Sequence, residues 1–219
     1  MVFNELKESY SIKDNQINNL VDRRFCVFDL EATGLDFNNE FIIQIGAVVV
    51  EDMKIDYTNT FKTYVKSPKQ IPVEIEKLTS ITNHNIISEP VFAEVFEGFR
   101  EFAGNSVLVA QCGFEFDFYL LKKECERNNL KAYNNIEIDT KVLFANIHND
   151  IEETFSTDYL LKYYEIYSKD VKRHDALGDS ILISRILIEI LNEYREKGIN
   201  DFILNKELVI KKFIPKLLI

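Results

Sequence analysis

Residues 26–35 read CVFDLEATGL, and this stretch decides how the chain folds. Its first residues are apolar, as in a buried strand, and two carboxylates then follow, Asp29 and Glu31, with only Leu30 between them. Alternate side chains of a strand share a face, so both acids point the same way. Buried ionised carboxylates are unfavourable unless a positive group compensates them. Two oxygen donors on one face suit Mg²⁺ or Mn²⁺, although two solvated acids at a strand end are the alternative.

The segments around this strand predict an α/β fold. Residues 41–50 and 57–65 form apolar or alternating runs, and their short spacing from residues 25–31 predicts an antiparallel meander. Beyond residue 89, stretches with apolar residues at helical spacing alternate with short apolar runs. Helices are predicted from Pro90, Phe114, Lys141, Ser156 and Ala176, and further strands at 106–110 and 136–138. This order predicts a sheet of about five strands that is covered by helices.

The composition disfavours several classes of protein. The net charge is −10, whereas a protein that holds duplex DNA through many phosphates is usually basic, so broad electrostatic binding of nucleic acid is disfavoured. A narrow site that carries its own cations is compatible with this charge. The longest apolar run, residues 41–50, is interrupted by Gln44 and is too short to span a membrane. The acidic start and the three cysteines without CxxC spacing predict a cytoplasmic protein with reduced thiols.

Two further clusters contain candidate ligands. Asp117 stands just beyond a buried strand at the start of a helix, where an acid also favours the helix dipole, and Glu115 competes with it for a functional role. His174 and Asp179 are five residues apart, so they converge only if His174 precedes a helix and Asp179 lies on its first turns. Asp175 is a suitable N-cap at that junction.

The motifs FDLEATGL, FEFDFYLL, IDTKVLFA and HDALGDSIL, in this order, resemble those of the DEDDh family of 3′→5′ exonucleases. This family includes the epsilon proofreading subunit of bacterial DNA polymerase III. The resemblance extends from about Phe25 to Leu191, which is most of the chain. It implies a ribonuclease H-like α/β fold, with a mixed five-stranded sheet and helices on both faces. It also implies phosphodiester hydrolysis assisted by two divalent ions, Mg²⁺ or Mn²⁺.

The resemblance also implies roles for individual residues. The four metal ligands would be Asp29, Glu31, Asp117 and Asp179. His174 would accept a proton from the attacking water, and Leu35 would pack on the terminal base, next to Thr33 and Gly34 of the same motif. Phe114 is a candidate for stacking on a base, although aromatic residues at helical spacing usually belong to the core. Lys172-Arg173, beside the histidine, is a weaker candidate for a phosphate contact.

The chain also departs from the family pattern. Ala32 replaces a threonine of the first motif, and the family's His-Asn pair is absent before Asp117, where Gln111 is the candidate substitute. The acid at Asp139 is interpreted as a helix cap or a neighbour of the ligands rather than as a ligand. No member of the acidic quartet is missing, so we expect an active enzyme.

These observations predict three segments. They are an N-terminal arm or helix at 1–22, an exonuclease domain at 23–195 and a C-terminal helical tail at 196–219. The predicted function is a metal-dependent 3′→5′ exonuclease that acts on the 3′ ends of single-stranded DNA or RNA. The alternatives are a non-catalytic partner module, which would dock on a polymerase through the amphipathic tail, and a small nucleotide phosphodiesterase. The complete set of acids and histidine favours an enzyme, because a scaffold has no physical need for them.

Overall fold

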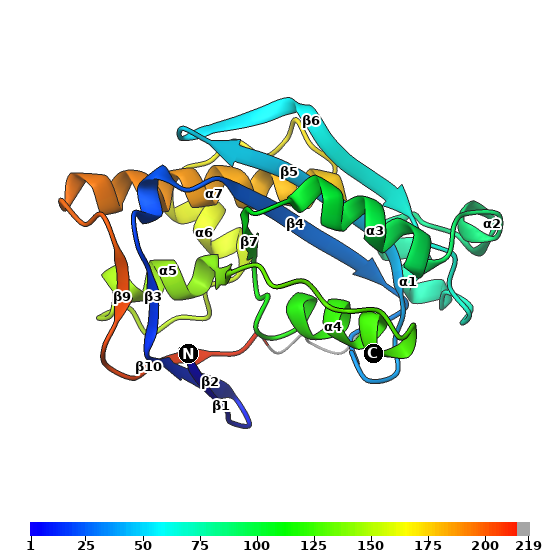
Figure 1. The fold of residues 1–219 in the computed structure, drawn as a ribbon, viewed down its shortest axis with the longest axis horizontal. Coiled ribbons are helices and arrows are strands. Elements are labelled where there is room, and N and C mark those ends of the chain that lie inside the picture. Colours follow the sequence, from blue (N-terminus) through cyan, green and yellow to red (C-terminus); the bar gives the residue numbers. More distant parts are fainter. Residues whose placement is uncertain (214–219) are drawn as a thin grey trace.

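The centre of the molecule is a mixed five-stranded sheet with strand order β6-β5-β4-β7-β8 (Figure 1). The computed structural model describes residues 1–213, and residues 214–219 lie outside this part. β4 pairs antiparallel with β5 and parallel with β7; β5 continues antiparallel to β6, and β7 parallel to β8. The bounds are β4 Phe25–Ala32, β5 Ile42–Glu51, β6 Lys54–Tyr64, β7 Val107–Ala110 and β8 Glu137–Asp139. The predicted five-stranded mixed sheet is therefore confirmed.

Helices cover both faces of this sheet, as predicted (Figure 1). The long helix α7 packs across β4 and β5 on one face, whereas α3 and α4 cover the other face through contacts with Phe28 and Phe61. The remaining helices lie at the edges and ends of the sheet. The bounds are α1 Val73–Thr79, α2 Asn83–Ile86, α3 Phe92–Ala103, α4 Asp117–Arg127, α5 Thr140–Ile147, α6 Thr157–Tyr163 and α7 Ala176–Glu196.

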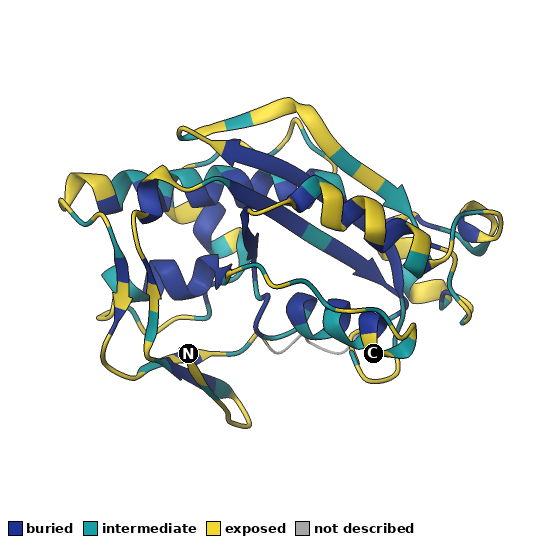
Figure 2. Cartoon of the chain, viewed as in Figure 1, coloured by how far each residue is buried: buried dark blue, intermediate teal, exposed yellow. Residues whose placement is uncertain are grey.

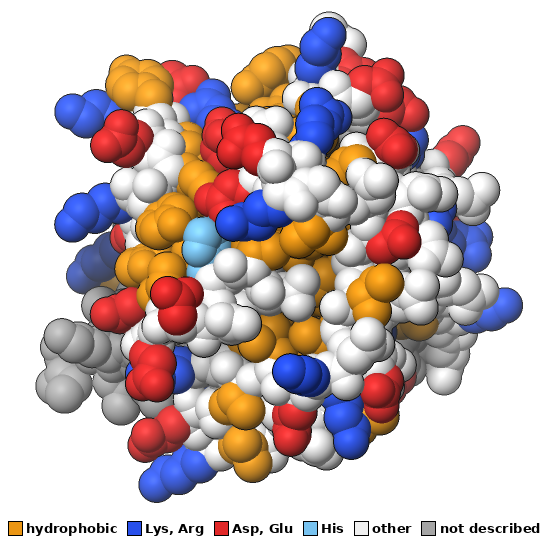
Figure 3. Space-filling view, turned by 90° about the vertical axis from the view of Figure 1, so that its left-hand side faces the viewer, with side chains coloured by type: hydrophobic (Ala, Val, Ile, Leu, Met, Phe, Trp, Pro, Cys, Tyr) orange, Lys and Arg blue, Asp and Glu red, His pale blue; other side chains and the backbone are white. Residues whose placement is uncertain are grey.

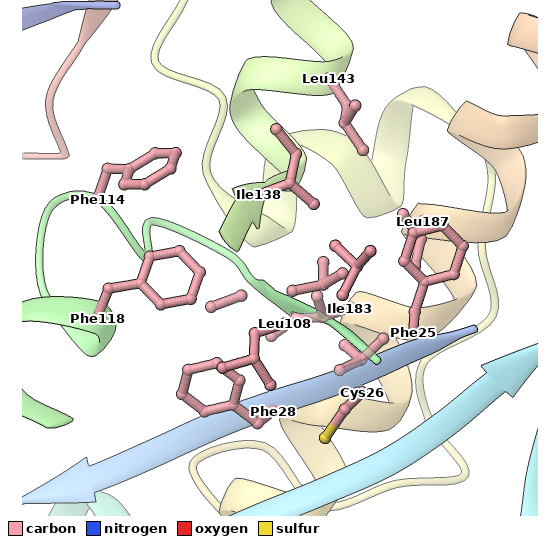
Figure 4. Close-up of a cluster of buried hydrophobic side chains, with 14 of the residues drawn as sticks. Phe25, Cys26, Phe28, Leu108, Phe114, Phe118, Ile138, Leu143, Ile183 and Leu187 are labelled. Atoms are coloured by element: carbon pink, nitrogen blue, oxygen red, sulfur yellow. The ribbon is translucent and has the colours of Figure 1, made fainter. Parts of the chain in front are cut away.

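The apolar core lies between the sheet and these helices. Figure 2 shows β4, β5 and β7 almost wholly buried, whereas the edge strand β6 is largely exposed, in agreement with its alternating sequence. Figure 4 shows the core side chains that β4, β7, β8, α4, α5 and α7 contribute. Among them, Phe28 packs edge-on against Phe99 and tilted against Phe118. Burial of these large rings provides the main driving force for holding α3 and α4 against the sheet.

The two terminal segments form strands, so the N-terminal segment is an extended arm rather than an α-helix, and the prediction of a C-terminal helical tail is wrong for the described residues. β2 pairs antiparallel with both β1 and β10, and β3 pairs antiparallel with β9. The pairing joins the first 17 residues to residues 202–211, and it buries Tyr10, Ile12 and Ile210. The bounds are β1 Val2–Glu5, β2 Ser9–Lys13, β3 Asn15–Ile17, the 3-10 turn η1 Leu20–Asp22, β9 Phe202–Leu204 and β10 Leu208–Lys211. Phe202, Leu204 and Ile210 of the tail are thus buried against their own chain.

Smaller differences concern the helix starts. The helix predicted from Pro90 begins two residues later, after Val91, and the short helices α1 and α2 were not predicted. The helix predicted from Phe114 begins at Asp117, because residues 112–116 form a turn whose first residue, Cys112, has a positive φ of 60°. Within the described residues, no helix has the length and apolar composition needed to span a membrane.

Candidate active site

The first two acids lie on the central strand and share a face, as predicted. Asp29 is paired with Gly46 and Glu31 with Gln44 of β5, in an unbroken register; the irregularity in this pairing comes only after Glu31. Their side chains therefore point to the same side of the sheet, toward α7. Glu31 is only 9% exposed. Burial raises the pKa of both Asp29 and Glu31, so their surroundings disfavour the ionised form of each acid.

The third element of the site is the start of α7, which carries Asp179. Asp175 is the N-cap, as predicted, and its carboxylate accepts a hydrogen bond from the Gly178 N–H at 3.2 Å. A Cβ atom at Gly178 would overlap the carbonyl of Lys172, so this glycine lets the preceding loop fold closely over the first helical turn. His174 lies in that loop with a φ of 55°, and its N–H donates to the Asp179 carboxylate at 2.7 Å. The convergence of His174 and Asp179 required by the prediction is therefore present.

Asp117 reaches the same region from the opposite side of the sheet. It is the first residue of α4, it is 5% exposed, and the Leu30 main chain between the two β4 acids forms a hydrogen bond with its carboxyl group. Asp117 is also the largest charged influence on Asp29. The four acids that the sequence singled out thus come together, although they are up to 150 residues apart in the chain.

Three of these acids are close enough to bind a single cation. Among the described residues, one carboxylate oxygen each from Asp29, Glu31 and Asp179 lies within 4.8 Å of the others. Asp117 adjoins this group without belonging to it. Clusters of carboxylate oxygens are the donor set that Mg²⁺ and Mn²⁺ prefer, so these residues fit a divalent ion.

The electrostatics of the site also favour a cation. Burial, reinforced by Asp179, raises the pKa of Glu31 to about 8, and burial, reinforced by Asp139, raises the pKa of Asp117 to about 7. Burial likewise raises the pKa of Asp29 well above its usual value, with Asp117 the next contributor. Without a cation, the cluster therefore retains protons near neutral pH. A divalent ion would displace these protons and make the ionised acids favourable.

Arg173, a candidate for a phosphate contact from its place in the sequence, forms ion pairs with two acids in the structure. Arg173 donates from Nε to Asp179 and from Nη1 to Asp158, both at 2.6 Å. Its charge opposes the effect of burial on the pKa of Asp179. The neighbouring Lys172 donates to the Thr79 carbonyl at 3.2 Å, on the main chain rather than on an acid. The only sequence signal for the role of Arg173 was its place beside His174.

The loop after β4 presents one of the predicted substrate contacts. Leu35 is 63% exposed, which is compatible with packing on a base. Thr33 is only 1% exposed; its hydroxyl donates to Glu40 at 2.6 Å and accepts from the Phe41 N–H at 3.0 Å. Thr33 therefore shapes the loop instead of facing a substrate. A Cβ atom at Gly34 would be 2.9 Å from the Glu40 side chain, so this glycine lets Glu40 close the loop.

Two other predicted contacts belong to the interior. Phe114 is 4% exposed and packs between Phe3 and Phe118, so the structure corrects its assignment from base stacking to the core. Gln111 is 6% exposed, and its amide is occupied by Thr140 and by the Phe155 carbonyl. It is therefore not free to replace the missing His-Asn pair in contacting phosphate. Both corrections follow from burial, which local sequence patterns do not reveal.

The fold and the acids together define a class of protein. The nuclease domain of 3′hExo, a DEDDh family member solved with rAMP, shares this fold with a TM-score of 0.67 at 20% identity, over 78% of this chain and 92% of that chain. Exonuclease X, solved with 5′-overhanging duplex DNA, gives a TM-score of 0.60 at 22% identity, over 78% and 91% of the two chains. These similarities show that the chain shares the fold of these exonuclease structures.

The sequence comparisons identify the family itself. A family profile described as Exonuclease (RNase_T) matches residues 26–187, and the chain belongs to this family. It is 34% identical over 197 residues to the DNA polymerase III subunit epsilon of Aquifex aeolicus, covering 90% of this chain and 95% of that protein. It is also 33% identical over 200 residues to the PolC-type DNA polymerase III of Caldanaerobacter subterraneus, but spans only 14% of that protein. The predicted enzyme class, an exonuclease, is therefore confirmed.

Proposed function

We propose that the chain is a metal-dependent 3′→5′ exonuclease that removes nucleotides from the 3′ ends of single-stranded DNA or RNA. The observation that carries this proposal is the convergence of the carboxylates of Asp29, Glu31 and Asp179 within 4.8 Å, with Asp117 beside them. A carboxylate cluster of this kind can hold cations beside a phosphodiester, where they offset the negative charge of both the protein and the substrate. The 3′-exonuclease names of proteins with this fold support the polarity.

The acids would hold two divalent ions, and Asp29 would contribute to both. Glu31 and Asp179 would complete one ion site, and Asp117 would serve the other directly or through water. When bound, such ions lower the pKa of a coordinated water and stabilise the charge on the phosphate and on the leaving oxygen. The elevated pKa values of Glu31 and Asp117 support this assignment, because a cation relieves the cost of ionising them.

His174 would accept the proton of the attacking water. Histidine is the most common general base in enzymes, and His174 lies on an exposed loop directly before the helix that carries Asp179. The hydrogen bond from the His174 N–H to Asp179 links the position of this loop to the acidic cluster. The water oxygen bonds to phosphorus while the bond from phosphorus to the 3′ oxygen breaks. The released 3′ oxygen takes a proton from solvent, and His174 returns its proton to solvent. The products are a nucleoside monophosphate and a chain with a new 3′ hydroxyl.

Substrate binding would rely on a narrow site instead of an extended basic surface. Acidic and basic side chains are interspersed over the face shown in Figure 3, in keeping with the net charge of −10. Leu35 is presented by a loop that Glu40 organises through Thr33 and through Lys69 Nζ, the latter at 2.6 and 2.7 Å. Arg127 also donates to the carbonyls of this loop. A preorganised loop can hold Leu35 against a terminal base at low entropic cost.

The test is degradation of 5′-labelled single-stranded DNA and RNA in Mn²⁺, with Asp29→Asn as the inactive control. We expect a ladder that shortens from the 3′ end and disappears with chelator. A ladder with only one of the two polymers would identify that polymer as the substrate. Intact oligonucleotides combined with release from nitrophenyl nucleotide esters would replace the proposal by a small nucleotide phosphodiesterase.

We also propose that the enzyme works in the cytoplasm beside a DNA polymerase. The support is the similarity to proteins named as DNA polymerase III epsilon and PolC. Docking through a helical tail is not part of this proposal, because residues 202–211 pair with the N-terminal strands and residues 214–219 lie outside the described part. Co-purification with the replicative polymerase would test the partnership, and a fully independent enzyme would argue against it.

A further inference from the structure

A polar residue interrupts the most apolar strand of the sheet. Gln44 lies in the run FIIQIGAVVV of β5, is 0% exposed and is paired with Glu31 of β4. The next residue on the same face is Gly46, which is paired with Asp29. The two β5 residues beside the acids are thus a fully buried polar residue and the smallest residue of that strand. An apolar strand needs neither of them for packing, so their roles lie elsewhere.

Gln44 holds the first residue of α7. Its side-chain oxygen accepts a hydrogen bond from the Ala176 N–H at 2.8 Å. The first N–H groups of a helix have no partner within the helix, so a buried helix start must obtain one from elsewhere. Only the oxygen of an amide can accept a hydrogen bond, and this fixes the orientation of the Gln44 side chain. The sheet therefore fixes the helix start through one directed bond.

Gly46 supplies the space for this contact. A Cβ atom at position 46 would overlap the main chain of Ala176 and Leu177. The start of α7 therefore lies directly against β5, closer than a residue with a Cβ atom at position 46 would permit. The hydrogen bond from Gln44 and the close approach at Gly46 act on the same part of α7. Together they set how far the helix start lies from the sheet and where it lies along β5.

The position of this helix start decides where Asp179 lies. Ala176 and Asp179 are three residues apart, so they lie on neighbouring parts of the same helix side, about 4.5 Å apart along the axis. Since the first turn moves as a unit, a displacement at Ala176 is passed on to the Asp179 carboxylate. We propose that Gln44 is a positioning residue, which acts through the Ala176 N–H to place Asp179 against Asp29 and Glu31. This inference rests on the proposed function, because it assigns the placement to metal binding.

A second observation favours this role over simple packing. The Gln44 Nε2 atom is buried and has no hydrogen-bond partner among the described residues. Buried donors without partners are rare because they are costly. Leucine or methionine would fill the same space without that cost but could not bind the Ala176 N–H. The hydrogen bond that the structure gives Gln44 is the one its oxygen accepts from Ala176, and neither leucine nor methionine could replace it.

The test compares Mn²⁺ binding and turnover in three variants of the full chain. Gln44→Met removes the acceptor at nearly constant volume, Gln44→Glu keeps an acceptor oxygen, and Val48→Ala is the matched control. Val48 is buried on the same strand and face, but it pairs with Val27, away from the acids. We expect Gln44→Met to weaken Mn²⁺ binding by titration calorimetry and to lower kcat, each about 10–100-fold, with little change in KM. Gln44→Glu keeps an acceptor for the Ala176 N–H, so it should lose less Mn²⁺ affinity than Gln44→Met, and Val48→Ala should lose stability only.

The outcomes separate the two proposals. Failure of the wild type to bind Mn²⁺ would overturn the proposed function and this inference together. Binding by the wild type with equal affinity in Gln44→Met, or equal losses in Val48→Ala, would overturn the positioning role alone. If Gln44→Met does not fold, hydrogen exchange of the wild type tests the bond instead. The Ala176 amide should exchange slowly with solvent, although a residue at this helix position is ordinarily unprotected, and fast exchange would refute the bond.

Discussion

Replacement of Glu31 by glutamine should stabilise the protein while abolishing its activity. Burial, reinforced by Asp179, raises the pKa of Glu31 from 4.5 to about 8. Glutamine has nearly the shape of the protonated side chain but cannot ionise. In the metal-free protein, Glu31→Gln therefore removes the cost of placing a charge in an acidic, buried cluster. The same change removes a proposed metal ligand, so turnover should fall by orders of magnitude.

The size and the sign of this effect follow from proton linkage. Between pH 4.5 and about 8, the folded wild type retains a proton that the unfolded chain has released, so the free energy of unfolding falls as the pH rises. Each pKa unit corresponds to about 1.4 kcal/mol. The span of about 3.5 units therefore corresponds to about 5 kcal/mol at pH 8 and above if Glu31 titrates alone, and to less when Asp29 and Asp179 share protons with it. Below pH 4.5 the effect is absent.

Urea denaturation in the presence of chelator, from pH 4.5 to 8.5, measures this difference directly. We expect the free energy of unfolding of Glu31→Gln to exceed that of wild type by an amount that grows from near zero to about 2–5 kcal/mol. Addition of Mn²⁺ at pH 8 should reverse the order, because the ion stabilises only a folded protein that binds it. A pH-independent difference, or one that shrinks as the pH rises, would refute the electrostatic account of the site.

Four further outcomes are expected. Asp179→Ala should retain the fold by circular dichroism but lose turnover by orders of magnitude, and full activity would exclude it as a ligand. His174→Ala should lose about 10²–10⁴-fold in kcat with an unchanged melting temperature, because the side chain is exposed, and an unchanged kcat would exclude a general base. Mn²⁺ should raise the melting temperature more at pH 8 than at pH 5.5, since binding must expel the protons of the acids; equal shifts would contradict this. Gly46→Ala should destabilise the protein by at least about 2 kcal/mol in denaturant titration, and a neutral effect would contradict the close contact with α7.

Local patterns were sufficient for the central sheet and for the placement of its first two acids. The alternation that places Asp29 and Glu31 on one face needs only the period of a strand, and the observed register preserves it. The predicted caps at Asp139 and Asp175 were likewise correct, because a capping side chain bonds to a backbone group two or three residues away. Interactions between residues this close in the chain can be predicted from the local sequence.

Long-range pairing caused the errors. Residues 202–211 are apolar enough for an amphipathic helix, but β10 and β9 pair with β2 and β3, almost the whole chain away. Nothing within either segment indicates its partner. The assignment of Phe114 to a base failed for a related reason, because its burial depends on Phe3 from the N-terminal strand. Strand propensity and exposure are decided by what a segment meets in space.

The sequence by itself predicted the sheet and the shared face of Asp29 and Glu31, since both depend on short-range periodicity, and its resemblance to a known family singled out Asp117, Asp179 and His174. Only the tertiary structure decided how the acids interact. It showed that burial raises the pKa values of Glu31 and Asp117, that Arg173 pairs with Asp179, and that Gln44 holds the helix start. These properties depend on distances between residues far apart in the chain, and folding alone brings them together.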